Sequence, residues 1–160
     1  GALQVSVCSV PAAADRYQDV NEASMVLRLN YHDFSALLMA DAGVEVEQEL
    51  IRQGINPVTL LKVGHHGSKT ATSPPFLAAL QPQLALISAG ANNYFKLPAP
   101  EVVARIEQQG IRLYRTDQQG TIRVSTDGTS WSVSTYTARD RTLASLRCFF
   151  LTSSGCWDNN

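Results

Sequence analysis

Two adjacent histidines, His65 and His66, stand between Gly64 and Gly67 at the end of a short apolar run. The glycines allow a sharp backbone turn and leave both imidazole rings uncrowded, which suits a metal ligand on a loop that follows a strand. Loop histidines that bind only the backbone would show the same spacing. The motif leaves a metal-binding role and a structural role open.

Asp41 favours the metal-binding interpretation. It directly follows the apolar run 34–40, as the histidine pair follows the run 58–63, so these side chains leave one edge of a sheet if the strands are parallel. A carboxylate there is costly unless it meets a cation, and carboxylate with imidazole suits zinc, manganese or iron. The alternative is that Asp41 caps a helix that begins near Val44.

The segments around these residues alternate between strand and helix patterns. His32 and Asp33 are expected to form a tight hairpin turn, and Asp127-Gly128 predicts a second hairpin with a type I′ turn. Ser73 is expected to cap a helix that begins at Pro74. Together these patterns predict an α/β fold with a mixed, partly antiparallel sheet. The expected strands are 24–31, 34–40, 58–63, 84–89, 111–114, 120–126 and 131–136, and the other expected helices are 44–52 and 101–109.

Length and composition indicate one globular domain. The chain has 160 residues, of which 44% are hydrophobic and 17% charged, and this excludes a disordered or collagen-like protein. A net charge of −1 excludes a basic surface over the whole chain, so any contact with nucleic acid must be local. No apolar run is long enough for a membrane span, and no secretory leader is expected at the start.

The C-terminal segment differs in character from the rest. We expect a domain at 1–136 and a tail at 137–160 that is frayed or docks as one short helix, with a nucleic-acid arm of arginines as the alternative. Those arginines are Arg139, Arg141 and Arg147. The cysteines, Cys8, Cys148 and Cys156, follow no zinc-binding spacing, although a disulfide between the last two stays open.

Several short motifs occur in a specific order along the chain. They are Leu61-Lys62-Val63-Gly64-His65-His66-Gly67-Ser68, Pro75-Phe76-Leu77, Ile87-Ser88-Ala89-Gly90, Asn92-Asn93, Pro98, Pro100-Glu101-Val102, and Arg115-Thr116-Asp117 to Gly120. In this order they resemble the C-terminal metallo-β-lactamase-like domain of the ComEC family of competence proteins. The resemblance covers about residues 3–126.

The resemblance implies a fold, a site and a role. The fold would be the second half of an αββα sandwich. Asp41 would bridge two divalent metal ions, zinc or manganese, and either His65 or His66 would complete the shell of one of them. Activated water would then hydrolyse a phosphodiester of DNA. The parent protein would be a DNA-uptake channel in the bacterial inner membrane, to which this chain would be attached as a soluble part.

The chain also departs from the family pattern. The H-x-D-x-D-H-type block expected upstream of Asp41 is absent. Because His32 is expected in a turn, Asp41, His65 and His66 are the available ligands, too few to hold two ions, so we expect weak metal binding. The family's Gly-Asp is Ala40-Asp41 here, which keeps the carboxylate.

A second departure lies in the loop that usually reads N-x-Y-G-H-P. This chain has Lys96 in place of the glycine and Leu97 in place of the histidine. Lys96 is a candidate phosphate contact, with a solvated lysine as the alternative. Asn92 and Asn93 are candidate substrate-binding residues, with turn formation as the alternative, and Asp117 is expected in a turn.

Two functions from different classes follow. The first is a metal-dependent nuclease domain with Asp41, His65 and His66 as catalytic residues, complete only with the upstream half of the domain. The second is a non-catalytic scaffold with a degenerate metal site that binds DNA or the channel. The expected partners are DNA, the channel part of the parent, that upstream half, and a second copy through an exposed sheet edge.

Overall fold

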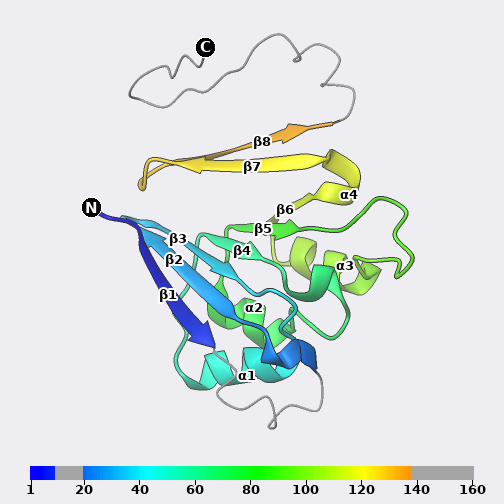
Figure 1. The fold of residues 1–160 in the computed structure, drawn as a ribbon, viewed down its shortest axis with the longest axis horizontal. Coiled ribbons are helices and arrows are strands. Elements are labelled where there is room, and N and C mark those ends of the chain that lie inside the picture. Colours follow the sequence, from blue (N-terminus) through cyan, green and yellow to red (C-terminus); the bar gives the residue numbers. More distant parts are fainter. Residues whose placement is uncertain (10–19, 138–160) are drawn as a thin grey trace, which may run out of the picture.

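The computed structural model describes residues 1–9 and 20–137. These residues form an α/β fold around a six-stranded mixed sheet in the order β1-β2-β3-β4-β5-β6, with a separate two-stranded hairpin (Figure 1). The α/β class and the mixed sheet predicted from the sequence are confirmed, whereas a metallo-β-lactamase-like sandwich stays a prediction. The arginine and cysteine predictions for 138–160 lie outside the described residues.

The first three strands form the antiparallel part of the sheet. They are β1 (Gln4–Ser9), β2 (Val26–Tyr31) and β3 (Phe34–Leu38). His32 and Asp33 form the predicted two-residue turn between β2 and β3, and His32 has a positive φ of 51°. The apolar run at 34–40 leaves the sheet at Leu38, so two residues separate the last strand residue from Asp41.

The other strands pair in parallel and are connected through helices. From β3 the chain runs through α1 (Val44–Arg52) to β4 (Leu60–Lys62). It continues through α2 (Pro74–Leu80) to β5 (Leu84–Ile87), and then through α3 (Pro100–Gln108) to β6 (Arg112–Arg115). The expected cap of α2 is confirmed, because the Phe76 N–H donates to the Ser73 hydroxyl. Since β3 to β6 are parallel, the loops that follow them gather at one edge of the sheet.

Each face of the sheet carries its own apolar layer. Leu37, Leu61 and Ala85 point to the face on which Figure 1 shows α1 and α2, and they pack with the helices in the main core. Ala36, Leu60 and Leu84 point to the opposite face. The central strands are buried on both sides, which explains why they are continuous apolar runs.

The opposite face is covered by the hairpin of β7 (Thr121–Thr126) and β8 (Trp131–Tyr136). The hairpin was predicted, but the type I′ turn was wrong, because Thr126 pairs with Trp131 and leaves a four-residue loop. Asp127 orders this loop by accepting the N–H groups of Thr129 and Ser130. These hydrogen bonds lower the pKa of Asp127 to about 2.

The chain beyond β6 begins with the short helix α4 (Thr116–Gln119). Asp117, expected in a turn, lies in this helix and forms an ion pair with Arg115 at 2.6 Å. None of the helices in the described residues is long and apolar enough to cross a membrane.

Candidate functional site

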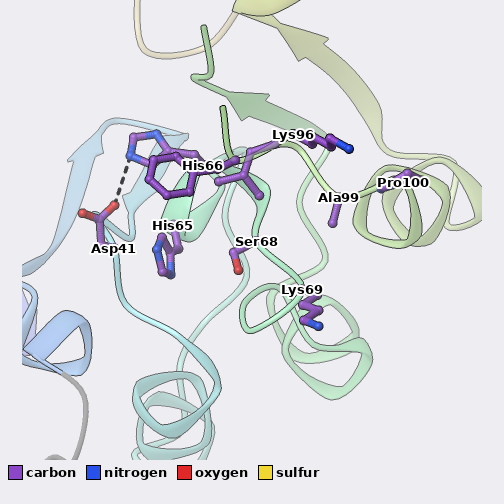
Figure 2. A pocket seen from close by; sticks show the side chains of 10 residues that line it. Asp41, His65, His66, Ser68, Lys69, Lys96, Ala99 and Pro100 are labelled. Carbon is purple, nitrogen blue, oxygen red and sulfur yellow. Dashed lines mark ion pairs between the residues drawn. The ribbon is translucent and has the colours of Figure 1, made fainter. Parts of the chain in front are cut away.

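The turn that follows β3 packs directly on the histidine turn that follows β4. The His65 backbone N–H donates to the Ala40 carbonyl at 2.9 Å, and the Ala42 N–H closes a tight turn onto the Met39 carbonyl at 3.0 Å. The prediction that Asp41 and the histidine pair meet at one sheet edge is therefore confirmed in geometry (Figure 2).

The two glycines of the histidine turn are needed for different reasons. A Cβ on Gly64 would lie 2.6 Å from the Ala42 carbonyl oxygen, so any side chain there would separate the two turns. Gly67 has a φ of +80°, and its Cβ would lie 2.6 Å from Cβ of Pro98. Gly64 thus permits close approach of the Asp41 turn, and Gly67 permits close approach of the loop that ends at Pro98.

Asp41 and His66 face each other on one side of a cavity at this edge of the sheet. Asp41 Oδ1 lies 3.4 Å from His66 Nε2, and both side chains are about half exposed. The other ring nitrogen of His66, Nδ1, lies 2.7 Å from the Ser88 carbonyl oxygen. A carbonyl only accepts, so Nδ1 is the nitrogen that carries the proton. In the neutral ring the Nε2 lone pair therefore points toward a carboxylate oxygen, which requires a cation or a proton between them.

The Ser88 carbonyl shares its peptide unit with the Ala89 N–H, and that unit is held by a contact that sequence analysis missed. The Thr116 hydroxyl donates to the Ala89 carbonyl at 2.7 Å and accepts from the Ala89 N–H at 2.9 Å. These two bonds tie the segment that follows β5 to the start of α4. Thr116 is part of the quoted Arg115-Thr116-Asp117 motif, but only the fold reveals that it positions the carbonyl that orients His66.

His65 has a different environment from His66. It lines the same cavity, and its ring lies edge-to-face to that of His66 with the centroids 6.5 Å apart. Within residues 1–9 and 20–137, no group of three or more His, Cys, Asp and Glu side chains is close enough to hold a metal ion. The structure therefore pairs Asp41 with His66 and leaves His65 outside that pair.

Four residues at or next to this cavity have a strained backbone. Ala40, His65, His66 and Lys96 all have φ between 45° and 55°, in the left-handed region that residues other than glycine rarely adopt. Each such residue costs on the order of 1 kcal/mol or more, and the surrounding hydrogen bonds must offset that cost. Such strain is typical of functional sites.

The cavity has a volume of about 540 Å³ and is flanked by positive charge. In Figure 2, Asp41 and His66 lie on one side, and Lys69 and Lys96 extend on the other. Leu97, which the resemblance led us to expect in place of a family histidine, also lines the cavity. Its side chain offers neither a metal ligand nor a proton.

Asn93 builds the loop beside the cavity. Its side-chain N–H groups donate to the carbonyls of Gly90 and Leu97 at 2.9 and 2.6 Å, and its Oδ1 accepts the Leu97 N–H at 3.0 Å. This is the turn-forming role that the sequence left open. Neither Asn92 nor Asn93 is among the cavity-lining residues, so substrate binding by either stays a prediction.

The N-terminus of α1 is capped by Glu22 and not by Asp41, for which capping was the alternative role. The alternative role of Asp41 as an N-cap is wrong, because α1 begins after Gly43 and has no side-chain cap from its own N-terminal residue. Glu22 takes this place, since its Oε2 accepts the N–H groups of Gly43 and Val46 at 3.2 Å each. Asp41 is therefore left to face His66.

A second buried carboxylate, Glu47, fixes the segment that leads from the histidine turn to α2. It accepts the N–H groups of Thr72 and Ser73, the latter at 2.9 Å. Arg105 of α3 donates to the Thr72 carbonyl at 2.6 Å. Burial raises the pKa of Glu47 despite these hydrogen bonds.

Lys62, the last residue of β4, adds a partly buried positive charge near Asp41. Its Nζ donates to the Val63 carbonyl at 3.0 Å. Burial lowers the pKa of Lys62, while the negative charge of Asp41 opposes that shift. Lys62 was quoted within the motif but was not singled out from the sequence as a site residue.

Comparison with known proteins shows which family the chain is related to. No family model matches the chain. Over 122 residues, or 76% of the chain, it is 42% identical to ComE operon protein 3 of Bacillus subtilis. Over 107 residues it is 36% identical to Competence protein ComA of Neisseria gonorrhoeae, and over 105 residues 35% identical to Recombination protein 2 of Haemophilus influenzae. The chain is a homologue of the ComEC family of competence proteins.

The match is to one segment of these ComEC proteins. The chain spans 16% of the length of the first two relatives and 13% of the third. The resemblance inferred from the motif order is confirmed at the level of the family. Lys96 and Leu97, the two residues expected to depart from the loop pattern of the family, both line the cavity.

Proposed function

We propose that this chain supplies one half of a metal-dependent phosphodiesterase centre that acts on DNA in a ComEC-type DNA-uptake protein. The relatives are competence proteins, and this supports a role in DNA uptake and makes DNA the substrate to test first. The membrane channel of such a protein and the upstream half of the domain are the partners that this proposal requires.

The observation that carries the proposal is the arrangement of Asp41, His66 and Ser88. With its Nδ1 proton held by the Ser88 carbonyl, a neutral His66 presents the Nε2 lone pair to Asp41 Oδ1 at 3.4 Å. Two ligands about 2.1 Å from a tetrahedral zinc ion are roughly 3.4 Å apart, so the pair fits a shared ion. A backbone carbonyl that orients a ligating histidine is the usual outer contact of such a site.

In this proposal, two side chains would hold the metal ion and two others would bind the phosphodiester. Asp41 and His66 would hold the ion, and Lys69 and Lys96 would bind the non-bridging oxygens of the phosphodiester. When bound, a divalent ion supplies Lewis-acid stabilisation of the phosphoryl oxygens and a water of lowered pKa. The further ligands of a two-ion centre would come from the upstream half.

A second candidate function is a scaffold that binds DNA or the channel without cleaving DNA. The observation in its favour is Leu97, which lines the cavity where the family pattern places a histidine. In this version the lysines still bind phosphate, while Asp41 and a protonated His66 form an ion pair that orders the two turns.

Cleavage assays with Mn²⁺ or Zn²⁺ separate the two functions. We expect negligible cutting of single- or double-stranded DNA by the 160-residue chain. A longer chain that includes an H-x-D-x-D-H-type segment is expected to cut DNA and to lose this activity with Asp41→Ala or His66→Ala. His65→Ala is expected to keep more activity than His66→Ala. If the longer chain cuts equally well without Asp41, the metal-site assignment is wrong, and if it never cuts, the scaffold is the function.

A further inference from the structure

Two aromatic side chains of the loop next to the cavity are largely exposed. Tyr94 is 92% exposed and Phe95 is 78% exposed, which makes them the most exposed large hydrophobic residues in the described part of the chain. Phe95 lines the cavity together with the adjacent Lys96. Single exposed apolar residues are common, but an adjacent pair at the rim of a charged cavity indicates a ligand.

The loop that carries these residues is held in one conformation. The three side-chain hydrogen bonds of Asn93 close it, and the Lys96 N–H donates to the Asn93 carbonyl at 3.1 Å. The Ala99 N–H then donates to the Gly67 carbonyl at 2.9 Å, which attaches the loop to the histidine turn. Because the loop is already ordered, a ligand that binds it loses little affinity to ordering of the backbone.

The geometry of the ring pair leaves room for flat partners. The Tyr94 and Phe95 rings meet edge-to-face, with centroids 5.5 Å apart and an interplanar angle of 84°. The edge of one ring can cover at most one face of the other, so the remaining faces are not covered within the pair. The high exposure of both side chains shows that little else in the described residues covers them. Such faces can stack on unpaired bases, whereas the bases of a duplex are already stacked on one another.

We propose that Tyr94 and Phe95 form an aromatic platform that binds the unpaired bases of a single strand, with Lys69 and Lys96 contacting its phosphates. This inference deepens the proposed function, because it places a strand beside Asp41 and His66 and selects single-stranded over double-stranded nucleic acid. Since the net charge of the chain is −1, base stacking must supply affinity that a basic surface would otherwise provide.

The test is fluorescence anisotropy of a labelled twelve-nucleotide oligo(dT) with the 160-residue chain in EDTA. The matched control is Tyr136→Ala on β8, which removes another exposed aromatic that does not line the cavity. The combined variant Tyr94→Ala/Phe95→Ala is expected to weaken binding about 10-fold or more, in line with stacking of one or two bases. The combined variant Tyr94→Phe/Phe95→Tyr is expected to bind within about 2-fold of the wild type, because it retains both rings.

Two further readouts separate stacking from charge. Lys96→Ala is expected to reduce the slope of log affinity against log salt by about 0.7, the value for one phosphate contact on a single strand. A duplex of the same length is expected to bind more weakly and to be unaffected by loss of the two rings.

The proposal is overturned if the double alanine variant binds oligo(dT) as the wild type does, or if Tyr136→Ala weakens binding equally. It is also overturned if the wild type does not bind the oligonucleotide, and the platform is then a surface for another protein. Because EDTA removes metal ions, these results do not depend on cleavage. Ring-dependent binding without cleavage by the longer chain would contradict the proposed function and leave this inference intact.

Discussion

Replacing Thr116 with valine tests whether this residue positions the candidate site. Valine has nearly the shape of threonine but cannot make the two hydrogen bonds to Ala89, at 2.7 and 2.9 Å, in a partly buried environment. Each such bond contributes about 1 kcal/mol, so Thr116→Val is expected to lower the free energy of unfolding by about 2 kcal/mol. For a domain of this size that corresponds to a fall of about 6 °C in Tm.

The assay is urea and thermal unfolding of Thr116→Val beside Thr116→Ser, which keeps the hydroxyl and is expected to stay within about 0.5 kcal/mol of the wild type. Loss of the bonds also loosens the Ser88 carbonyl, so zinc affinity is expected to fall about 10-fold in the valine variant. Equal stability of the valine and serine variants would refute the hydrogen-bond argument. A stability loss with unchanged zinc affinity would refute the positioning of His66.

Two other substitutions test the supports of the site. The pKa of Glu47 is raised, so the folded state binds the carboxyl proton more tightly than the unfolded state does. The free energy of unfolding is therefore expected to fall as the pH rises from the ordinary pKa of 4.5 through the raised value. Glu47→Gln removes this slope in urea titrations at several pH values, and an unchanged slope would contradict the assignment. Ala40→Gly removes the strain of a φ of +50°, while the larger conformational entropy of glycine in the unfolded state opposes that gain. The net effect expected in the same assay is stabilisation by about 0.5 kcal/mol. A destabilised glycine variant would show that Ala40 is not strained.

The sequence was sufficient to predict which residues meet at the sheet edge. Asp41 and the histidine pair each follow an apolar run, and parallel pairing of β3 with β4 brings the ends of those runs together. The strand and helix patterns extend over several residues, so an error of one residue in a predicted boundary does not change the order or packing of the elements. The helix expected at 101–109, for example, is found one residue earlier at Pro100–Gln108.

The sequence was insufficient where one contact between distant residues decides the outcome. Our proposal of His66 rather than His65 as the metal ligand rests on the Ser88 carbonyl, 22 residues further along the chain. The cap of α1 comes from Glu22, which precedes the helix by about 20 residues, whereas the local pattern offered Asp41 as the alternative. No local periodicity contains such information.

The most direct test of the metal site is to determine which histidine binds zinc. The chain has only three histidines, so the imidazole nitrogens can be assigned by ¹⁵N NMR and followed as Zn²⁺ is added. We expect weak binding that shifts Nε2 of His66, leaves the ring nitrogens of His65 and His32 nearly unchanged, and weakens at least 10-fold with Asp41→Asn. A zinc-dependent shift at His65 or His32 without one at His66, or a His66 shift that does not depend on Asp41, would contradict the assignment of Asp41 and His66 as the metal ligands.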